Sequence, residues 1–134
     1  QSGVISTPPT SVASGSPFPP VTYDGTTYEI AQVNNALVFP GLGLGVIVAR
    51  ATRITDGMLL AAAEAVAGKA DAHGPGASLL PRVADLRATS AVVAAAVARA
   101  AKADGVATAP VDERLDAAID RAMWRCAYHP VNAV

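Results

Sequence analysis

The chain has 134 residues, with ten basic and eleven acidic side chains and a net charge of −1 at pH 7. This length suits one domain, and the balanced charge without a basic cluster argues against a nucleic-acid partner. Hydrophobic residues make up 51% of the chain but aromatic residues only 4%, which predicts a helical core of small aliphatic side chains.

The amino-terminal part is predicted to be extended. Residues 1–20 hold five prolines, and within them only residues 12–14 could form a short strand. Residues 21–23 and 26–30 are rich in β-branched and aromatic side chains, and Asp24-Gly25 separates them. An Asp-Gly pair in this position is the strongest short-range signal for a β-hairpin, so we expect a small two-stranded hairpin here.

Two helices are expected after the hairpin. Pro40 is tolerated in a first helical turn, because the N–H that it lacks has no partner there, and a helix is predicted from about residue 41 to 51. The next helix begins at Thr55 or Asp56, either of which can cap the free N–H groups of its first turn. It ends at Gly68.

The carboxyl-terminal half predicts two further helices. Residues 69–77 are small, polar and glycine-rich, which indicates an exposed loop. The longest helix is expected over about residues 85–104. A last helix is expected over about residues 112–124, with acidic side chains near its start and basic ones near its end, as the helix dipole favours. We interpret Trp124 as an anchor that packs this last helix. The longest helix carries an apolar stripe of Leu86, Val92, Val93, Ala96, Val97 and Ala100.

Asn34 and Asn35 stand directly before an apolar run over residues 36–49. A carboxamide both donates and accepts hydrogen bonds, so one placed at the start of a buried segment can hold a substrate carboxylate or hydroxyl. The alternative is a loop pair whose side chains satisfy their own backbone. The spacing alone leaves both readings open.

Gly41, Gly43 and Gly45 differ from the dinucleotide-binding fingerprint G-x-G-x-x-G. The position of its third glycine is Val46, and no preceding strand with a downstream acid completes the unit. We interpret these glycines as sites of close helix packing.

Other polar residues give no catalytic pattern. Ser14 and Ser16 have no histidine near them in the sequence, and His73 and His129 both lie in loop-like contexts, which argues against a serine hydrolase. Five carboxylates lack the spacing of metal ligands and are read as solvated side chains. They are Asp24, Glu29, Asp56, Glu64 and Asp71.

Cysteine content and hydropathy indicate the cellular compartment in which the protein is expected. Cys126 has no second cysteine with which to form a disulfide or a finger-type zinc site. The apolar run over residues 36–49 falls short of the about 20 residues that span a bilayer, and no basic start precedes an apolar stretch at the amino terminus. These features predict a cytoplasmic protein without a membrane anchor or a secretion signal.

Several ordered motifs resemble the carboxyl-terminal end of malic enzymes. The resemblance covers about residues 13–128, whereas residues 1–12 depart from the family pattern and are expected to be a non-matching extended lead-in. Residues 13–134 are then the carboxyl-terminal segment of the NAD(P)-binding domain. The matching segments are 14–21, 32–35, 39–45, 53–58, 79–81 and 85–87.

The resemblance implies a fold and a function. Malic enzymes convert L-malate to pyruvate and CO2 with NAD or NADP and a divalent cation, Mg²⁺ or Mn²⁺. The implied fold class is α/β: the carboxyl-terminal portion of a Rossmann-like domain, mostly α-helical with about four helices and a small β-hairpin. The first asparagine of the family's pair contacts malate, which points to Asn34 as substrate-binding and to Asn35 as a weaker candidate.

The resemblance also implies what this chain lacks. The family's catalytic tyrosine and lysine, its acidic metal ligands and its dinucleotide loop lie upstream of the matched segments. The chain alone is therefore expected to be inactive and to bind no cofactor or metal, with L-malate, an upstream portion or second chain, and further copies of itself as partners. The alternative is a non-catalytic helical module that packs or self-associates.

Overall fold

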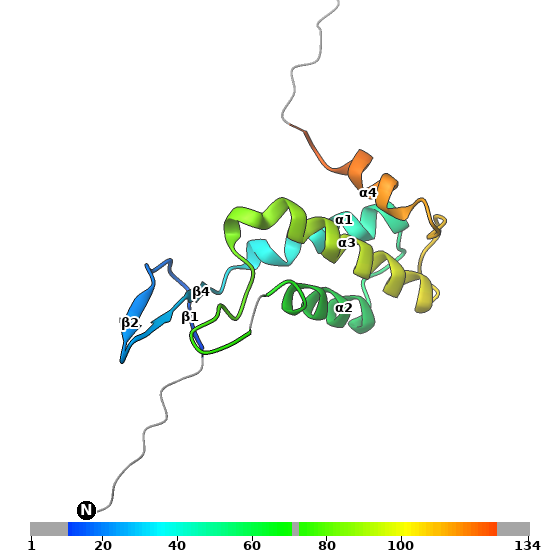
Figure 1. The fold of residues 1–134 in the computed structure, drawn as a ribbon. Coiled ribbons are helices and arrows are strands. Elements are labelled where there is room, and N and C mark those ends of the chain that lie inside the picture. Colours follow the sequence, from blue (N-terminus) through cyan, green and yellow to red (C-terminus); the bar gives the residue numbers. More distant parts are fainter. Residues whose placement is uncertain (1–10, 71–72, 126–134) are drawn as a thin grey trace, which may run out of the picture.

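The computed structural model describes residues 11–70 and 73–125. The expectations for residues 1–10, for Asp71 and for residues 126–134, which include Cys126 and His129, lie outside this part of the chain. The strands gather at one end of the molecule and the α-helices at the other (Figure 1). The expected α/β class is confirmed, and residues 11–70 and 73–125 form four α-helices and small sheets.

The predicted hairpin is present. Strands β2 (Val21–Tyr23) and β3 (Thr26–Tyr28) pair antiparallel. Asp24 and Gly25 have φ angles of 47° and 74°. These positive angles are those that a tight two-residue hairpin turn requires. The second arm is shorter than predicted, because Ile30 belongs to another sheet.

That second sheet is parallel. It pairs β1 (Val12–Ser14) with β4 (Ile30–Gln32), and Ala13 lies opposite Ala31. The strand expected at residues 12–14 is therefore confirmed. Because parallel strands run in the same direction, the carboxyl ends of β1 and β4 lie at the same edge of this small sheet.

The loop predicted as exposed over residues 69–77 contacts the hairpin. Its Gly76 is buried, and the Gly76 carbonyl accepts a hydrogen bond from the Glu29 N–H at 2.8 Å. Gly76 has a φ of 80°, and a Cβ built on it would lie 2.2 Å from the Thr27 carbonyl oxygen. Only glycine combines this backbone angle with this approach, so the expectation of an exposed loop is wrong at Gly76.

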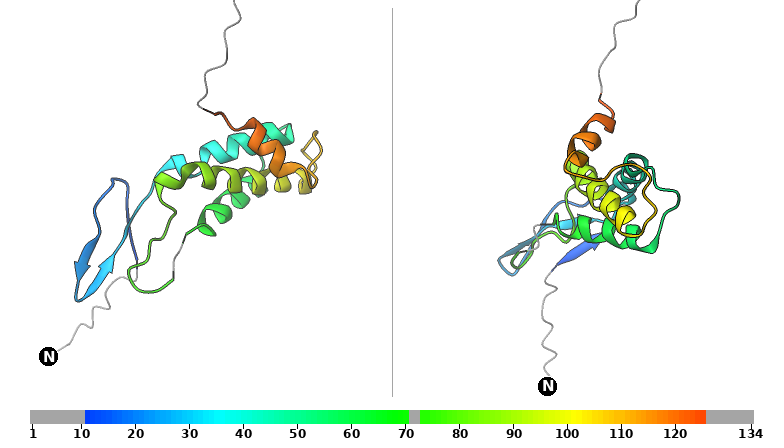
Figure 2. Two further views of the ribbon diagram at one scale, coloured as in Figure 1. Left: turned by 45° about the horizontal axis from the view of Figure 1, so that its top comes forward. Right: turned by 90° about the vertical axis from the view of Figure 1, so that its right-hand side faces the viewer.

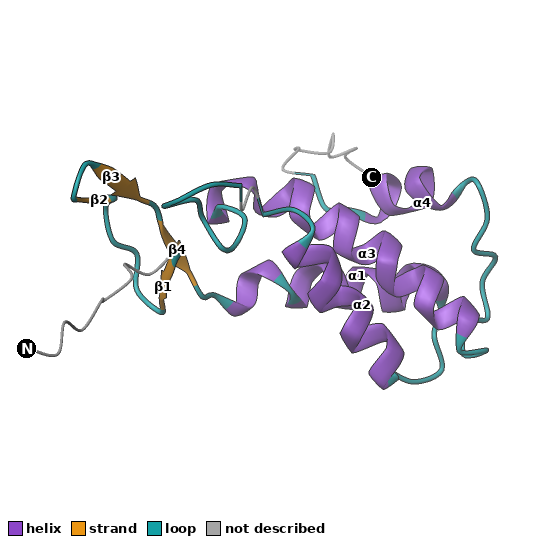
Figure 3. Cartoon of the chain, turned by 60° about the horizontal axis from the view of Figure 1, so that its bottom comes forward, coloured by secondary structure: helices purple, strands orange, loops and turns teal. Residues whose placement is uncertain are grey.

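The helices form the larger part of the molecule. Helix α3 lies at the centre and packs against α1, α2 and α4 (Figures 2 and 3). The core consists mostly of alanine and valine with a few larger aliphatic residues, as the composition predicts. The helices are α1 (Phe39–Ala49), α2 (Asp56–Ala67), α3 (Leu86–Ala103) and α4 (Leu115–Ala122), with short 3-10 turns at Asn35–Leu37 and Val83–Asp85.

Two of the three glycines in α1 allow its close packing on α3. A Cβ built on Gly41 would lie 2.5 Å from the Cβ of Val93, and one built on Gly45 would lie 2.7 Å from the Cβ of Val97. These glycines are four residues apart and share one helix face. Gly43 is exposed, and a Cβ there would meet nothing within 4 Å. The packing interpretation is confirmed for Gly41 and Gly45 and wrong for Gly43.

Two apolar side chains that we expected to be buried are exposed. Val92 belongs to the predicted stripe of the longest helix but is 41% exposed. The predicted packing role of Trp124 is also wrong, because this side chain is 78% exposed and only its backbone carbonyl accepts a bond, from Arg87 Nη1 at 2.9 Å. Helix α4 ends at Ala122, before the tryptophan, so the helix does not turn its ring towards the core.

Helix α4 also begins later than predicted, at Leu115. The Asp112 carboxylate accepts the Arg114 N–H at 2.9 Å and pairs with the Arg114 guanidinium at 2.8 Å. This local turn holds residues 112–114 outside the helix. The hydrogen bond from the Arg114 side chain also lowers the pKa of Asp112 below its usual value.

Thr55 caps α2 and joins it to α3. Its Oγ1 accepts the Met58 N–H at 3.2 Å and donates to the carboxylate of Asp104, at the end of α3. We expect Thr55→Ala to lower the free energy of unfolding by about 1 kcal/mol, the usual effect of losing such a cap. Thr55→Ser keeps the hydroxyl and serves as the control in urea unfolding. Equal stability of the two variants would contradict the capping role.

Candidate functional site

The candidate site lies where β4 leads into α1. Val33 follows β4, and its N–H donates to the Ser14 carbonyl at 2.8 Å, which extends the pairing to β1. The 3-10 turn Asn35–Leu37 comes next, and Leu37, only 1% exposed, fixes it to the core. Helix α1 then begins at Phe39, with Pro40 in its first turn as predicted. The asparagine pair is thus held between a strand and a packed helix.

Asn34 uses one half of its carboxamide to cap the turn. Its Oδ1 accepts the Ala36 N–H at 2.9 Å, and its backbone angles are extended. The backbone-satisfying role left open by the sequence is therefore present at Asn34. This hydrogen bond uses only the oxygen of the carboxamide. Among the described residues no acceptor contacts the Asn34 amide nitrogen. The half-buried side chain has a fixed orientation and two N–H donors left for a ligand.

Asn35 is placed differently. Its side chain is exposed, and its backbone carbonyl accepts the Val38 N–H at 3.0 Å. No side-chain hydrogen bond of Asn35 occurs within residues 11–70 and 73–125. Asn34 is therefore the better-oriented residue of the pair.

Polar residues follow both strands of the parallel sheet at the same edge. Ser14 ends β1 and Ser16 follows it, while Asn34 and Asn35 follow β4. In open α/β sheets, ligands bind outside the carboxyl ends of the strands, so this edge is where a ligand site belongs. His73 lies in the exposed loop between α2 and α3, and no hydrogen bond joins it to Ser14 or Ser16 in the part of the chain that the structure describes.

Neither the glycine run nor the carboxylates of the described residues form a phosphate or metal site. The run from Gly41 to Gly45 lies inside α1 and packs on α3, so it cannot form a phosphate-binding loop. No three His, Cys, Asp or Glu side chains come together as a possible metal site among the residues that the structure describes.

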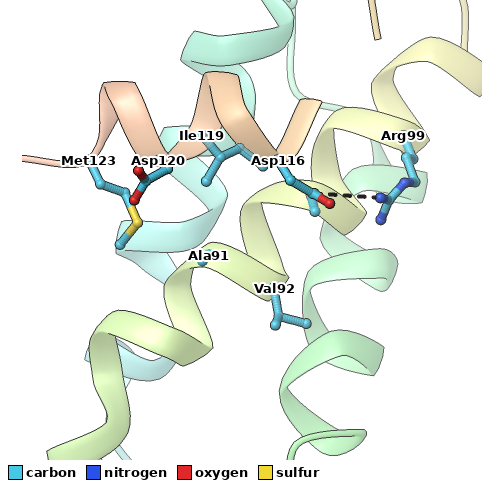
Figure 4. Close-up of a pocket in the computed structure, with 8 residues that line it drawn as sticks. Ala91, Val92, Arg99, Asp116, Ile119, Asp120 and Met123 are labelled. Carbon is cyan, nitrogen blue, oxygen red and sulfur yellow. Dashed lines mark ion pairs between the residues drawn. The ribbon is translucent and has the colours of Figure 1, made fainter. Parts of the chain in front are cut away.

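A cleft lies between α3 and α4, and nothing in the sequence pattern predicts it. It has a volume of about 390 Å³, and Figure 4 shows Arg99 of α3 facing Asp116 of α4 at one end of it, with the charged atoms 3.8 Å apart. Val92 contributes to its wall, which accounts for the exposure of that residue. The charged groups pair with each other on the surface, and none of the lining residues comes from the junction of β4 and α1.

These features define the class of protein. Two parallel strands with polar side chains after their carboxyl ends, followed by packed helices, form an α/β arrangement. The family described as "Malic enzyme, NAD binding domain" matches residues 5–102 of the sequence. The chain belongs to this family. The match begins inside the lead-in expected for residues 1–12, and that boundary stays a prediction.

Individual relatives agree with the family. The chain is 53% identical over 123 residues to "NAD-dependent malic enzyme 3" of Bacillus subtilis (strain 168), which covers 92% of this chain and 22% of the relative. It is 49% identical over 118 residues to "NAD-dependent malic enzyme" of Sodalis glossinidius (strain morsitans), a match that covers 87% of this chain and 21% of that relative. The crystal structure of malic enzyme from Pyrococcus horikoshii Ot3 matches with a TM-score of 0.65 and 32% identity, covering 84% of this chain and 24% of that chain.

The chain therefore spans about a fifth of the length of these curated relatives. The resemblance to malic enzymes is confirmed, and so is the Rossmann-like fold class. Among the helices of residues 11–70 and 73–125, none combines the length and the hydropathy needed to cross a bilayer.

Proposed function

We propose that this chain is part of an NAD-dependent malic enzyme and that it supplies Asn34 to the site where L-malate is oxidised and decarboxylated to pyruvate and CO2. The observation that carries the proposal is the fixed carboxamide of Asn34 at the carboxyl end of a parallel strand. Membership of the malic enzyme family supports the choice of substrate, and the names of the relatives favour NAD over NADP.

Asn34 acts by positioning. Its two amide N–H groups donate to a carboxylate or to the hydroxyl of malate, while its oxygen stays bonded to the Ala36 N–H. Because the cap prevents the carboxamide from rotating, the donors keep their direction before malate arrives. Such orientation brings the hydride of malate towards the nicotinamide without any proton transfer by Asn34.

The remaining chemistry belongs to the rest of the enzyme. The described residues hold no cluster of carboxylates for Mg²⁺ or Mn²⁺. Because the family resemblance implies that the cation site, the NAD site and the proton-transferring groups lie upstream of the matched segments, we assign them to sequence outside this chain and expect the chain alone to be inactive. NAD supplies the hydride acceptor, and the contribution of this chain is the oriented carboxamide and the helical scaffold behind it.

A chimera tests this function. The chain replaces the matching stretch of NAD-dependent malic enzyme 3 from Bacillus subtilis, to which it is 53% identical. We expect the chimera to reduce NAD when malate and Mg²⁺ or Mn²⁺ are present, and the chain alone to show no turnover. A chimera that unfolds cooperatively but forms no NADH from malate would disprove the proposal, because the fold would then be present without the site.

A second candidate, self-association, has one observation in its favour. Phe39 and Ile47 lie on α1, eight residues apart and close to one helix face, and they are 61% and 69% exposed. If α1 pairs with a second copy through this face, light scattering of the chain alone gives at least the mass of a dimer, and Ile47→Lys restores the monomer. A monomeric wild-type chain would exclude this candidate. Lys69→Ala, which lies outside α1, is the control.

A further inference from the structure

Thr89 carries a buried hydroxyl without a hydrogen-bond partner. It lies one turn into α3, and its side chain is fully buried. Among the described residues, no group bonds to its Oγ1. A hydroxyl in this state is unfavourable, because it has given up its bonds to water and gained none in return. Since nearly all buried polar groups in folded proteins have a partner, Thr89 points to a molecule that binds beside it.

Thr89 lines a cavity of about 360 Å³. The cavity is formed by residues that follow α2 and by residues at the start of α3, and its charged lining consists of Lys69, Arg82 and Asp85. A threonine in a helix has two accessible χ1 rotamers. The Thr89 hydroxyl can therefore turn towards the cavity while the side chain keeps its place in the core.

The donors around this cavity suit an anion. Lys69 and Arg82 bring two positive charges, and no carboxylate within residues 11–70 and 73–125 forms an ion pair with either of them. The start of α3 also borders the cavity, so the positive end of the helix dipole adds to their field. Ser78 spends its proton on the Leu80 carbonyl, at 2.8 Å. The donors left for a ligand are therefore the two cations and the Thr89 hydroxyl.

Asp85 determines which anion fits. Its carboxylate lines the same cavity and makes no capping bond to α3. An ionised carboxylate only accepts hydrogen bonds, so it repels an anion that has no proton to share. Near neutral pH, hydrogen phosphate keeps one P–OH group, whereas sulfate has none and a phosphate monoester is mostly a dianion without a proton. The lining therefore favours hydrogen phosphate over both.

We propose that this cavity is a site for inorganic phosphate. Lys69, Arg82 and the Thr89 hydroxyl donate to the phosphate oxygens, and Asp85 accepts from the P–OH group. The site does not depend on the proposed function, because none of its lining residues belongs to the junction of β4 and α1. Phosphate bound here joins the end of α2 to the start of α3, and it stabilises the folded chain because only the folded chain has the site.

Thr89→Val tests the hydroxyl, because valine has nearly the same shape but no donor. Calorimetric titration of the chain with inorganic phosphate, at an ionic strength held constant with chloride, should show saturable binding that this variant weakens about tenfold. Without phosphate the variant should melt no lower than the wild type, since it loses only an unpaired hydroxyl. Unchanged phosphate affinity overturns the site. A lower melting temperature without phosphate also overturns it, because the hydroxyl then has a partner within the protein.

Asp85→Asn tests the choice of anion. The wild type should bind phosphate about tenfold more tightly than sulfate, and Asp85→Asn should bind the two alike, because a carboxamide can donate to sulfate. Asparagine suits a helix start as well as aspartate does, so the fold is kept. Arg82→Gln should weaken both anions. Arg99→Gln, in the cleft between α3 and α4, is the matched control and should weaken neither. Equal affinity of the wild type for phosphate and sulfate overturns the assignment to phosphate.

Discussion

Asn34→Asp in the chimera is expected to lower kcat/KM for malate by about 100-fold or more while KM for NAD stays unchanged. Aspartate keeps the oxygen that accepts the Ala36 N–H, so the turn before α1 is preserved. It removes both amide donors and places a negative charge against a dicarboxylate substrate. A charge-assisted hydrogen bond contributes about 1.5 to 3 kcal/mol, and repulsion between like charges adds to its loss.

Two further variants separate the ligand contact from the cap. Asn34→Ser also keeps a capping oxygen but is neutral, so its loss should be smaller, about tenfold, since the two amide donors are absent but no like charge is added. Asn35→Ala removes the exposed carboxamide next to it and should change malate kinetics least. Steady-state kinetics with malate and NAD varied separately give all three results. Malate kinetics unaltered in Asn34→Asp would show that Asn34 serves only as a cap.

Much of the fold follows from local sequence chemistry. Asp24-Gly25 supplies the positive φ angles of a hairpin turn, and Thr55 supplies an oxygen for the start of α2. Pro40 lies in the first turn of α1, as its missing N–H allows. Each of these features depends on residues within about four positions of one another, which is the range that a sequence pattern describes well.

The features that could not be predicted depend on distant residues. The parallel pairing of β1 with β4 joins segments whose relation appears only once the hairpin between them has folded. The burial of Gly76 depends on its contact with Thr27, far away in the sequence. Trp124 and Val92 are exposed because α4 ends early and crosses α3 beside a cleft, which helical periodicity does not describe.

The candidate site was predictable in part. The asparagine pair before an apolar run indicated a possible carboxamide site, and the resemblance to malic enzymes singled out Asn34 and implied malate as its ligand. Its capping bond to Ala36 is one of the two readings that the sequence left open, since asparagine is a preferred cap before a helical turn. The meeting of Ser14 and Asn34 at one sheet edge could not, because it requires the parallel pairing of their strands.

The second large effect is expected at Gly45, in the contact between α1 and α3. A Cβ at this position would lie 2.7 Å from both the Ala94 carbonyl oxygen and the Cβ of Val97. Neither atom is the end of a flexible side chain, so Gly45→Ala forces the helices apart. Overpacking of this kind costs about 3 kcal/mol at the upper end of its usual range.

Gly43→Ala is the matched control, because it lies in the same helix and has no atom within 4 Å of the added methyl group. Both variants gain the same helix propensity, about 1 kcal/mol for replacing a mid-helix glycine. Gly43→Ala should therefore be stabilised by about 1 kcal/mol and Gly45→Ala destabilised by about 2 kcal/mol. The propensity term cancels in their difference, which leaves the packing term of about 3 kcal/mol.

Urea unfolding of the two variants measures this difference, and it also links the packing to the site. Helix α1 starts directly after the turn that Asn34 caps, so a shift of α1 away from α3 moves the carboxamide as well. In the chimera, Gly45→Ala should therefore raise KM for malate, whereas Gly43→Ala should leave it unchanged. Equal stability of the two variants would mean that α1 and α3 are not in close contact at Gly45, and Asn34 would then lack the support that fixes its direction.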